Sequence, residues 1–94
     1  MHTDTVEIFS DATNSALMKH PGRHFPGVLV QGDTLRSLCV AADAACKASR
    51  GRIDDEAYAG LNELRNHLWD FLNHYKSVLD AHKMSLPFDE TPDV

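Results

Sequence analysis

Hydrophobic and polar residues follow two different periods along this chain, and the period changes near residue 32. DTVEIFS at 4–10 alternates with the two-residue period of a strand. GVLVQ at 27–31 is β-branched and bounded by glycines, which also indicates a strand. ALMK at 16–19 fits either a second strand or one helical turn. We therefore predict two to three short antiparallel strands within about residues 4–31.

Beyond residue 32 the apolar spacing becomes helical. It predicts one helix over about 34–49, with Asp33 as its N-cap and Gly51 as its C-terminal stop. A longer apolar stripe predicts a second helix over about 55–83, which starts at Asp54 or Asp55. Because the connection between the helices is short, they should form an antiparallel hairpin.

The fold class that follows is α+β. The small N-terminal antiparallel sheet is expected to pack on the C-terminal two-helix hairpin. Ninety-four residues are enough for one small domain with a modest core, so we predict a single domain over 1–94. In the tail at 84–94, Leu86 and Phe88 should dock before the chain end frays.

The two cysteines indicate the compartment. Cys39 and Cys46 lie about two helical turns apart, too far for a bridge within one helix. Both fall on the inner face of the first predicted helix, so we interpret them as packing residues and not as nucleophiles. Reduced thiols suit a cytoplasmic protein, and no run approaches the about 20 apolar residues that cross a bilayer. We expect no membrane partner.

The net charge of the chain limits the classes of partner that it is expected to bind. A net charge of −5 argues against a general nucleic-acid binder, since phosphate neutralisation needs a basic surface. The charge is uneven, however, because residues 19–24 are basic and residues 54–56 are acidic. A local anion site is compatible with this distribution.

That basic region lies in KHPGRHFPGVLVQGD at 19–33. The Pro-Gly pairs at 21–22 and 26–27 combine a fixed φ with a permitted positive φ, which predicts two tight turns. Turn geometry requires neither Arg23 nor His24, which lie between the pairs. These two side chains are therefore candidates for an anion site at the sheet edge.

The second predicted helix carries His67, Asp70 and His74 along one edge, in line with Glu56 and Glu63. Imidazoles and carboxylates four residues apart can bind a metal, so a site at His67, Asp70 and His74 is an alternative. The favoured interpretation is a solvated helix face with pairs of interacting surface side chains, since no other predicted helix or strand offers metal ligands in a recognisable motif. We predict no metal and no cofactor.

A different flank of the same helix combines aromatic and cationic side chains. Its members are Tyr58, Arg65, Trp69 and Lys76. This composition is typical of interface hot spots and marks a candidate partner-binding surface. Two alternatives stay open: Trp69 belongs to the core, or the flank is buried in a homodimer.

The segments VEIFSDATN, PGRHFPGVLVQGD and LPF resemble a family of small uncharacterised bacterial proteins of unknown function with an SDATN…PGRxFPGxxxQGD pattern. The resemblance covers about 6–88. It implies a bacterial, cytoplasmic setting and no established activity. It also implies that a ligand site, where one exists, lies near five residues: Asp11, Asn14, Arg23, Gln31 and Asp33.

Since no complete catalytic constellation is present, we lean against an enzyme. The leading hypothesis is a non-enzymatic protein-binding module, immunity- or antitoxin-like by analogy of size and acidity. Its acidic surface would suit a basic partner such as a toxin or nuclease. The alternative is a small-ligand or anion site at the sheet edge that uses Arg23 and His24, with Asp11 or Asp33 as a polar partner.

Overall fold

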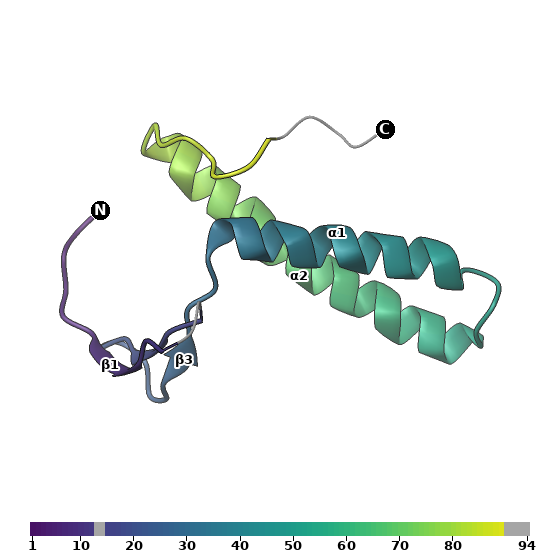
Figure 1. Ribbon diagram of the computed structural model, residues 1–94, viewed down its shortest axis with the longest axis horizontal. Helices are drawn as coiled ribbons and strands as arrows, with labels where there is room; N and C mark the ends of the chain where they lie inside the picture. The colour runs from purple at the N-terminus through teal and green to yellow at the C-terminus, as the bar shows by residue number, and fades with distance from the viewer. Residues whose placement is uncertain (13–14, 90–94) are drawn as a thin grey trace. The chain divides into compact units, whose positions relative to one another are not determined.

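The structure is a computed structural model that describes residues 1–12 and 15–89. It divides the chain into two compact units, Met1–Gln31 and Gly32–Val94. The first unit holds an antiparallel sheet and the second holds two helices that pack against each other (Figure 1). The predicted α+β class, with strands first and a helical hairpin second, is confirmed.

The sheet has three short strands in the order β1-β2-β3. They are β1 (Glu7–Ser10), β2 (Leu17–Lys19) and β3 (Gly27–Val28). The ambiguous ALMK segment is thus a strand. Ile8 pairs with Met18 whereas Ser10 pairs with Leu17, so the register shifts at Phe9. This irregularity interrupts the two-residue alternation that the sequence of β1 suggests.

The loop between β2 and β3 opens with a tight turn. The Arg23 N–H donates to the His20 carbonyl (3.0 Å), and the Gly22 N–H donates to His20 Nδ1 (2.9 Å). Neither Gly22 nor Gly27 adopts the positive φ that a glycine permits; among the described glycines, Gly51 alone does. A Cβ on Gly22 would instead lie 3.2 Å from the His20 ring. The imidazole that closes over this turn therefore favours a glycine there.

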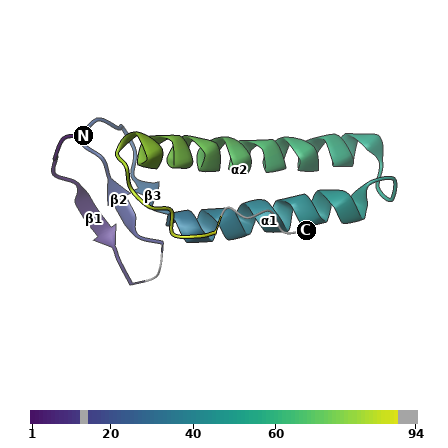
Figure 2. The same cartoon turned by 90° about the horizontal axis from the view of Figure 1, so that it is seen from above.

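The hairpin consists of α1 (Gly32–Ser49) and α2 (Asp55–Ala81), which run antiparallel side by side (Figures 1 and 2). Cys39 and Cys46 of α1 and Leu72 of α2 are its buried hydrophobic residues. The Cys46 thiol also points at the Leu61 carbonyl, with 3.8 Å between Sγ and the oxygen. The interpretation of both cysteines as packing residues agrees with this burial.

The N-termini of the two helices differ in how they are capped. Asp54 caps α2 as predicted, and its Oδ1 accepts the Ala57 N–H at 2.8 Å. The expected N-cap role of Asp33 is wrong, because α1 already begins at Gly32. Asp33 lies in the first helical turn, where its Oδ1 accepts the Thr34 N–H at 2.9 Å. A carboxylate in this position still complements the helix dipole.

The C-termini of the helices use left-handed residues. Gly51 follows α1 with φ 74°, which agrees with its predicted role as a stop. After α2, which ends at Ala81 and not at residue 83, Lys83 has φ 55°. The Met84 N–H then donates to the Leu79 carbonyl at 2.9 Å, as in a Schellman motif. This contact turns the chain back after α2.

The returning tail docks through the two residues that the sequence indicated. The Arg36 guanidinium lies 5.7 Å from the centre of the Phe88 ring, and both Leu86 and Phe88 are half-buried. The predicted fraying of the chain end concerns residues 90–94, which lie outside the described residues. Within the described part of the chain, neither helix has the length and apolar character needed to cross a membrane.

Candidate functional site

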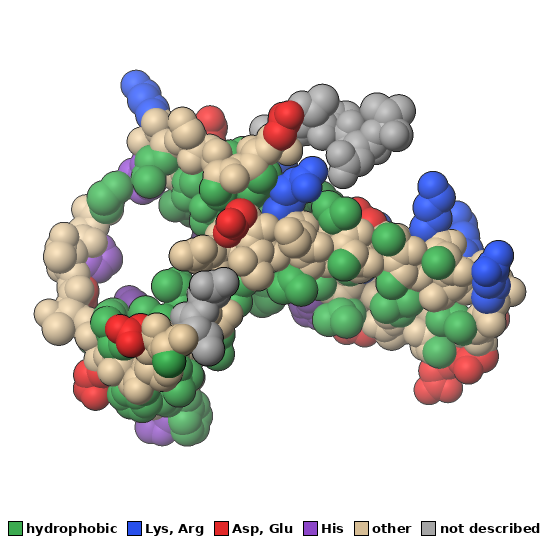
Figure 3. Space-filling view, viewed as in Figure 1, with side chains coloured by type: hydrophobic (Ala, Val, Ile, Leu, Met, Phe, Trp, Pro, Cys, Tyr) green, Lys and Arg blue, Asp and Glu red, His purple; other side chains and the backbone are tan. Residues whose placement is uncertain are grey.

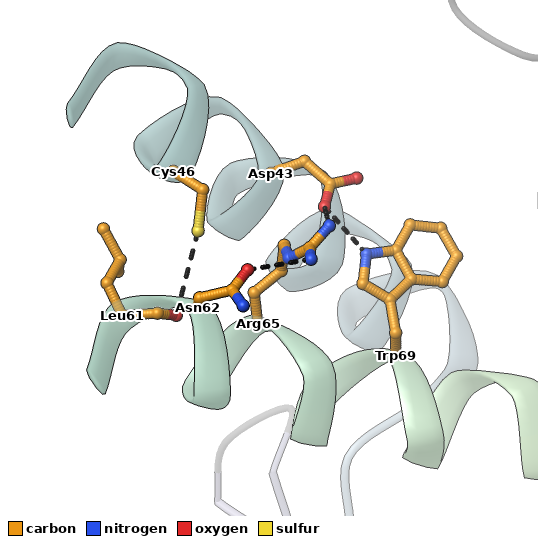
Figure 4. Close-up of polar contacts among 6 residues, drawn as sticks. All are labelled: Asp43, Cys46, Leu61, Asn62, Arg65 and Trp69. Atoms are coloured by element: carbon orange, nitrogen blue, oxygen red, sulfur yellow. Dashed lines mark hydrogen bonds and ion pairs between the residues drawn. The ribbon is translucent and has the colours of Figure 1, made fainter. Parts of the chain in front are cut away.

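One flank of the hairpin carries a polar cluster that joins α1 to α2 (Figure 4). The Trp69 Nε1–H donates to Asp43 Oδ1 at 3.0 Å. Arg65 Nη1 lies 3.6 Å from the same oxygen, and Arg65 Nη2 donates to Asn62 Oδ1 at 2.9 Å. The single tryptophan of the chain and a guanidinium are therefore held by one carboxylate from the opposite helix.

Helical geometry explains why these residues meet. At about 100° per residue, Arg65 and Trp69 lie on one side of the buried Leu72. Asp43 lies on the corresponding side of Cys39 in the antiparallel helix α1. Trp69 is half-buried. It is therefore part of the edge of the hairpin contact, and it does not join Leu72 in the buried centre.

Beside this cluster lies a groove of about 420 Å³. Its lining residues are Asp43, Cys46, Lys47, Arg50, Tyr58, Asn62 and Arg65. We call it the basic groove. Lys47 and Arg50 form no ion pair with any described residue, whereas Asp43 is already paired. Figure 3 shows Lys and Arg side chains gathered at the loop end of the hairpin.

One residue that lines the basic groove, Arg65, also has an unsatisfied donor. Arg65 Nε is buried and has no hydrogen-bond partner in the described part of the chain. Leaving a buried donor unpaired costs about 1–3 kcal/mol. The charged groups of the groove without an ion-pair partner among the described residues are thus the cations Lys47 and Arg50, which are suited to carboxylate or other anionic oxygens.

Asp43→Ala is expected to lower the free energy of unfolding by about 1 kcal/mol, because Trp69 loses its hydrogen-bond acceptor and Arg65 loses its ion-pair partner. The expected loss of stability is no larger because the side chains of Asp43 and Arg65 are both partly exposed, which weakens their ion pair. Urea denaturation followed by Trp69 fluorescence measures it. Asp43→Asn is the control, since its amide oxygen can still accept from Trp69 and should retain part of the stability. Wild-type stability in Asp43→Ala would contradict the role of this carboxylate.

The predicted partner-binding residues are only partly brought together. Tyr58 and Arg65 line the basic groove, and Trp69 adjoins it through Asp43. Lys76 instead lines a second groove, with Leu86 and Met84 of the tail. The candidate surface therefore contains Tyr58, Arg65 and Trp69, and Lys76 belongs to the tail-docking region.

The histidine edge of α2 is a surface feature. His67 Nε2 lies 3.8 Å from Glu63 Oε1, and both side chains are mostly exposed. Asp70 and His74 are exposed as well. Among the described residues, no group of three His, Cys, Asp or Glu side chains is arranged to hold a metal ion. An exposed i,i+4 pair of this kind contributes a few tenths of a kcal/mol.

The loop residues Arg23 and His24 have different surroundings. Arg23 borders a shallow hollow of about 180 Å³, together with His20 and Phe25. The His24 ring meets the Phe25 ring edge-on, with centroids 4.6 Å apart and an angle of 85°. Among the described residues that border this hollow, Arg23 is the only Lys, Arg, Asp or Glu, and His20 Nδ1 accepts from the Gly22 N–H.

The hollow beside Arg23 is not bordered by Asp11 or Gln31, two further members of the predicted ligand set. Asp11 and Gln31 are exposed in the sheet unit, and neither borders the hollow. Asp33 belongs to the first turn of α1 in the hairpin unit, and Asn14 lies outside the described residues. Among the described members of the predicted set in the sheet unit, Arg23 alone borders this hollow.

Sequence reasoning missed the α1 side of the basic groove. Asp43, Lys47 and Arg50 follow one another at helical spacing and so share one flank of α1. That spacing could have revealed a polar stripe. The facing stripe on α2 becomes its partner only once the helices are in register, which the spacing alone does not give.

Cys39 is unsuited to nucleophilic chemistry. Its side chain is fully buried. Burial first, and then the nearby Asp43 carboxylate, raise the pKa of the Cys39 thiol above its ordinary value. The thiol is therefore protonated at neutral pH, whereas attack requires the thiolate.

Comparison with known proteins assigns a family and no activity. No curated protein and no solved structure matches the chain. A family model described as a family of unknown function matches residues 1–88, which include the sheet, both helices and the docked Phe88. The chain therefore belongs to the Family of unknown function (DUF6959).

Proposed function

We propose that the protein is a non-enzymatic protein-binding module whose basic groove receives a carboxylate-bearing segment of a partner protein. The observation that carries this proposal is the pair of cations at the groove, Lys47 and Arg50, which have no ion-pair partner among the described residues. Carboxylates form charge-assisted hydrogen bonds with such cations, which are about twice as strong as bonds between neutral groups.

The fixed aromatic and guanidinium groups support protein recognition at this flank. Tyrosine, tryptophan and arginine are the residues most enriched at interface hot spots. Here Asp43 holds Arg65 and Trp69 in place before any partner arrives. Side chains that are already ordered lose less conformational entropy on binding, which favours affinity.

The positive charge of the basic groove changes which part of a partner is expected to bind there, compared with what the net charge of the chain suggests. Although the chain carries −5 overall, the uncommitted side chains in the groove are positive. An acidic segment would therefore enter the groove, while the acidic remainder of the chain would attract a partner that is basic elsewhere, such as a toxin. An immunity- or antitoxin-like role in a bacterial cytoplasm fits this charge arrangement. The buried free thiols also suit the reducing environment of a cytoplasm.

Site-specific photo-crosslinking in the native host tests the proposal. Tyr58 is replaced by benzoylphenylalanine, which keeps an aromatic ring at the groove. We expect one discrete covalent adduct with a partner protein, and we expect Arg50→Glu to abolish it by reversing the groove charge. The same probe at the exposed Ala44 is the position control and should give no such adduct. No adduct from position 58, or equal adducts from both positions, would refute the proposal.

The alternative function, anion binding at Arg23 and His24, is supported less well, because His24 contacts Phe25 and does not border the hollow beside Arg23. Arg23→Glu makes the same charge reversal as Arg50→Glu, in the loop. Under the proposal, the position-58 adduct survives Arg23→Glu. If Arg23→Glu abolishes the adduct and Arg50→Glu does not, the loop is the binding site.

A further inference from the structure

The flank of α2 opposite Arg65 exposes an apolar stripe. Leu64, Phe71 and Val78 are 55%, 64% and 39% exposed, respectively. They are spaced by seven residues, so they lie in line on successive double turns of the helix. At about 100° per residue they fall on the other side of the buried Leu72 from Arg65.

Helix α1 extends this apolar surface. Leu38 is 45% exposed and precedes the buried Cys39, so it lies on the side of α1 away from Asp43. Because Asp43 faces the flank of Arg65 and Trp69, Leu38 lies on the same side of the hairpin as the apolar stripe. Figure 3 shows hydrophobic side chains exposed along both helices.

The exposed apolar area accounts for most of the apolar share of a standard dimer interface. Leu38 and the three stripe residues together expose roughly 400 Å² per chain, judged from about 150–250 Å² for a large apolar side chain. A standard interface buries about 800 Å² per partner, of which about 60% is apolar. These four side chains thus supply most of the apolar share of one such interface.

The spacing of the stripe is also self-complementary. Phe71 is equidistant in sequence from Leu64 and Val78. When two copies of α2 pair antiparallel about an axis at Phe71, Leu64 of each copy meets Val78 of the other and the two phenylalanines meet at the centre. Such isologous pairing uses the same surface on both copies and closes as a dimer.

We propose that a second copy of this chain covers the apolar stripe, with the two α2 helices antiparallel and Phe71 at the two-fold axis. This flank is opposite to the Tyr58 and Trp69 flank for which the sequence suggested a homodimer. The basic groove stays accessible in this arrangement. The proposal is therefore independent of the proposed binding function.

Sedimentation equilibrium of the whole chain tests the dimer. We expect Phe71→Glu to raise the dimer dissociation constant by about 100-fold or more, because it removes the central aromatic contact and places two like charges together. Asn66→Glu adds the same charge on a different flank of α2 and should leave dimerisation unchanged. A wild-type chain that stays monomeric up to about 100 μM, or equal loss in both variants, would overturn the proposal.

Mixing two variants tests the position of the axis and controls for misfolding. Phe71→Glu and Phe71→Lys should each be monomeric alone, and their equimolar mixture should form a heterodimer, since opposite charges then meet at the axis. Recovery in the mixture shows that neither variant is unfolded. A mixture that stays monomeric would overturn the placement of Phe71 against its own copy.

Discussion

Leu72→Ala is expected to lower the free energy of unfolding of the helical hairpin by about 3 kcal/mol, which is typical of a large-to-small change in a core. Leu72 is 1% exposed, and the only other described side chain that is as fully buried is the smaller Cys39. A small domain is stabilised by only about 5–15 kcal/mol in total. The variant should therefore lose much of its resistance to urea when helix content is followed by circular dichroism.

Leu64→Ala is the matched control for this prediction. It makes the same chemical change in the same helix, but Leu64 is 55% exposed. It should cost less than about 1 kcal/mol when the protein is dilute enough to be monomeric. Equal losses in Leu72→Ala and Leu64→Ala would mean that the hairpin core is not centred on Leu72.

The helices could be predicted from sequence because their signals are local. The Asp54 cap, the left-handed Gly51 and the apolar period of α2 each depend on residues within a few positions of one another. The ends of the strands were predicted less accurately, since a strand ends where its pairing with the neighbouring strand ends. β3 stops at Val28 although the apolar run continues to Val30, and only Gly27 and Val28 pair with β2.

The sequence could predict the residues that α2 contributes to the candidate site, but not their contact with α1. Tyr58, Arg65 and Trp69 share a flank of one helix, which helical spacing shows. Their contact with Asp43 joins residues 26 positions apart and depends on how the helices are registered. Glycines posed a similar difficulty, since Gly22 is explained by the His20 ring and not by its φ.

Gly32→Ala is expected to lower the free energy of unfolding by about 2 kcal/mol, a usual cost of overpacking. The Tyr75 ring packs directly on the backbone of Gly32, and a Cβ at this position would overlap the ring. The ring would have to swing away and lose its contacts with α1. Urea denaturation of the variant, monitored by Trp69 fluorescence, measures the loss.

The sign of the Gly32 effect should reverse when Tyr75 is also replaced. In a Tyr75→Ala background the overlap disappears, and Gly32→Ala then only restricts the unfolded chain and favours the helix. It should stabilise that background by about 0.5–1 kcal/mol. This reversal separates close packing from a need for a glycine backbone, because a conformational need would persist without Tyr75. If Gly32→Ala destabilises both backgrounds equally, the Tyr75 ring is not the reason for glycine at position 32.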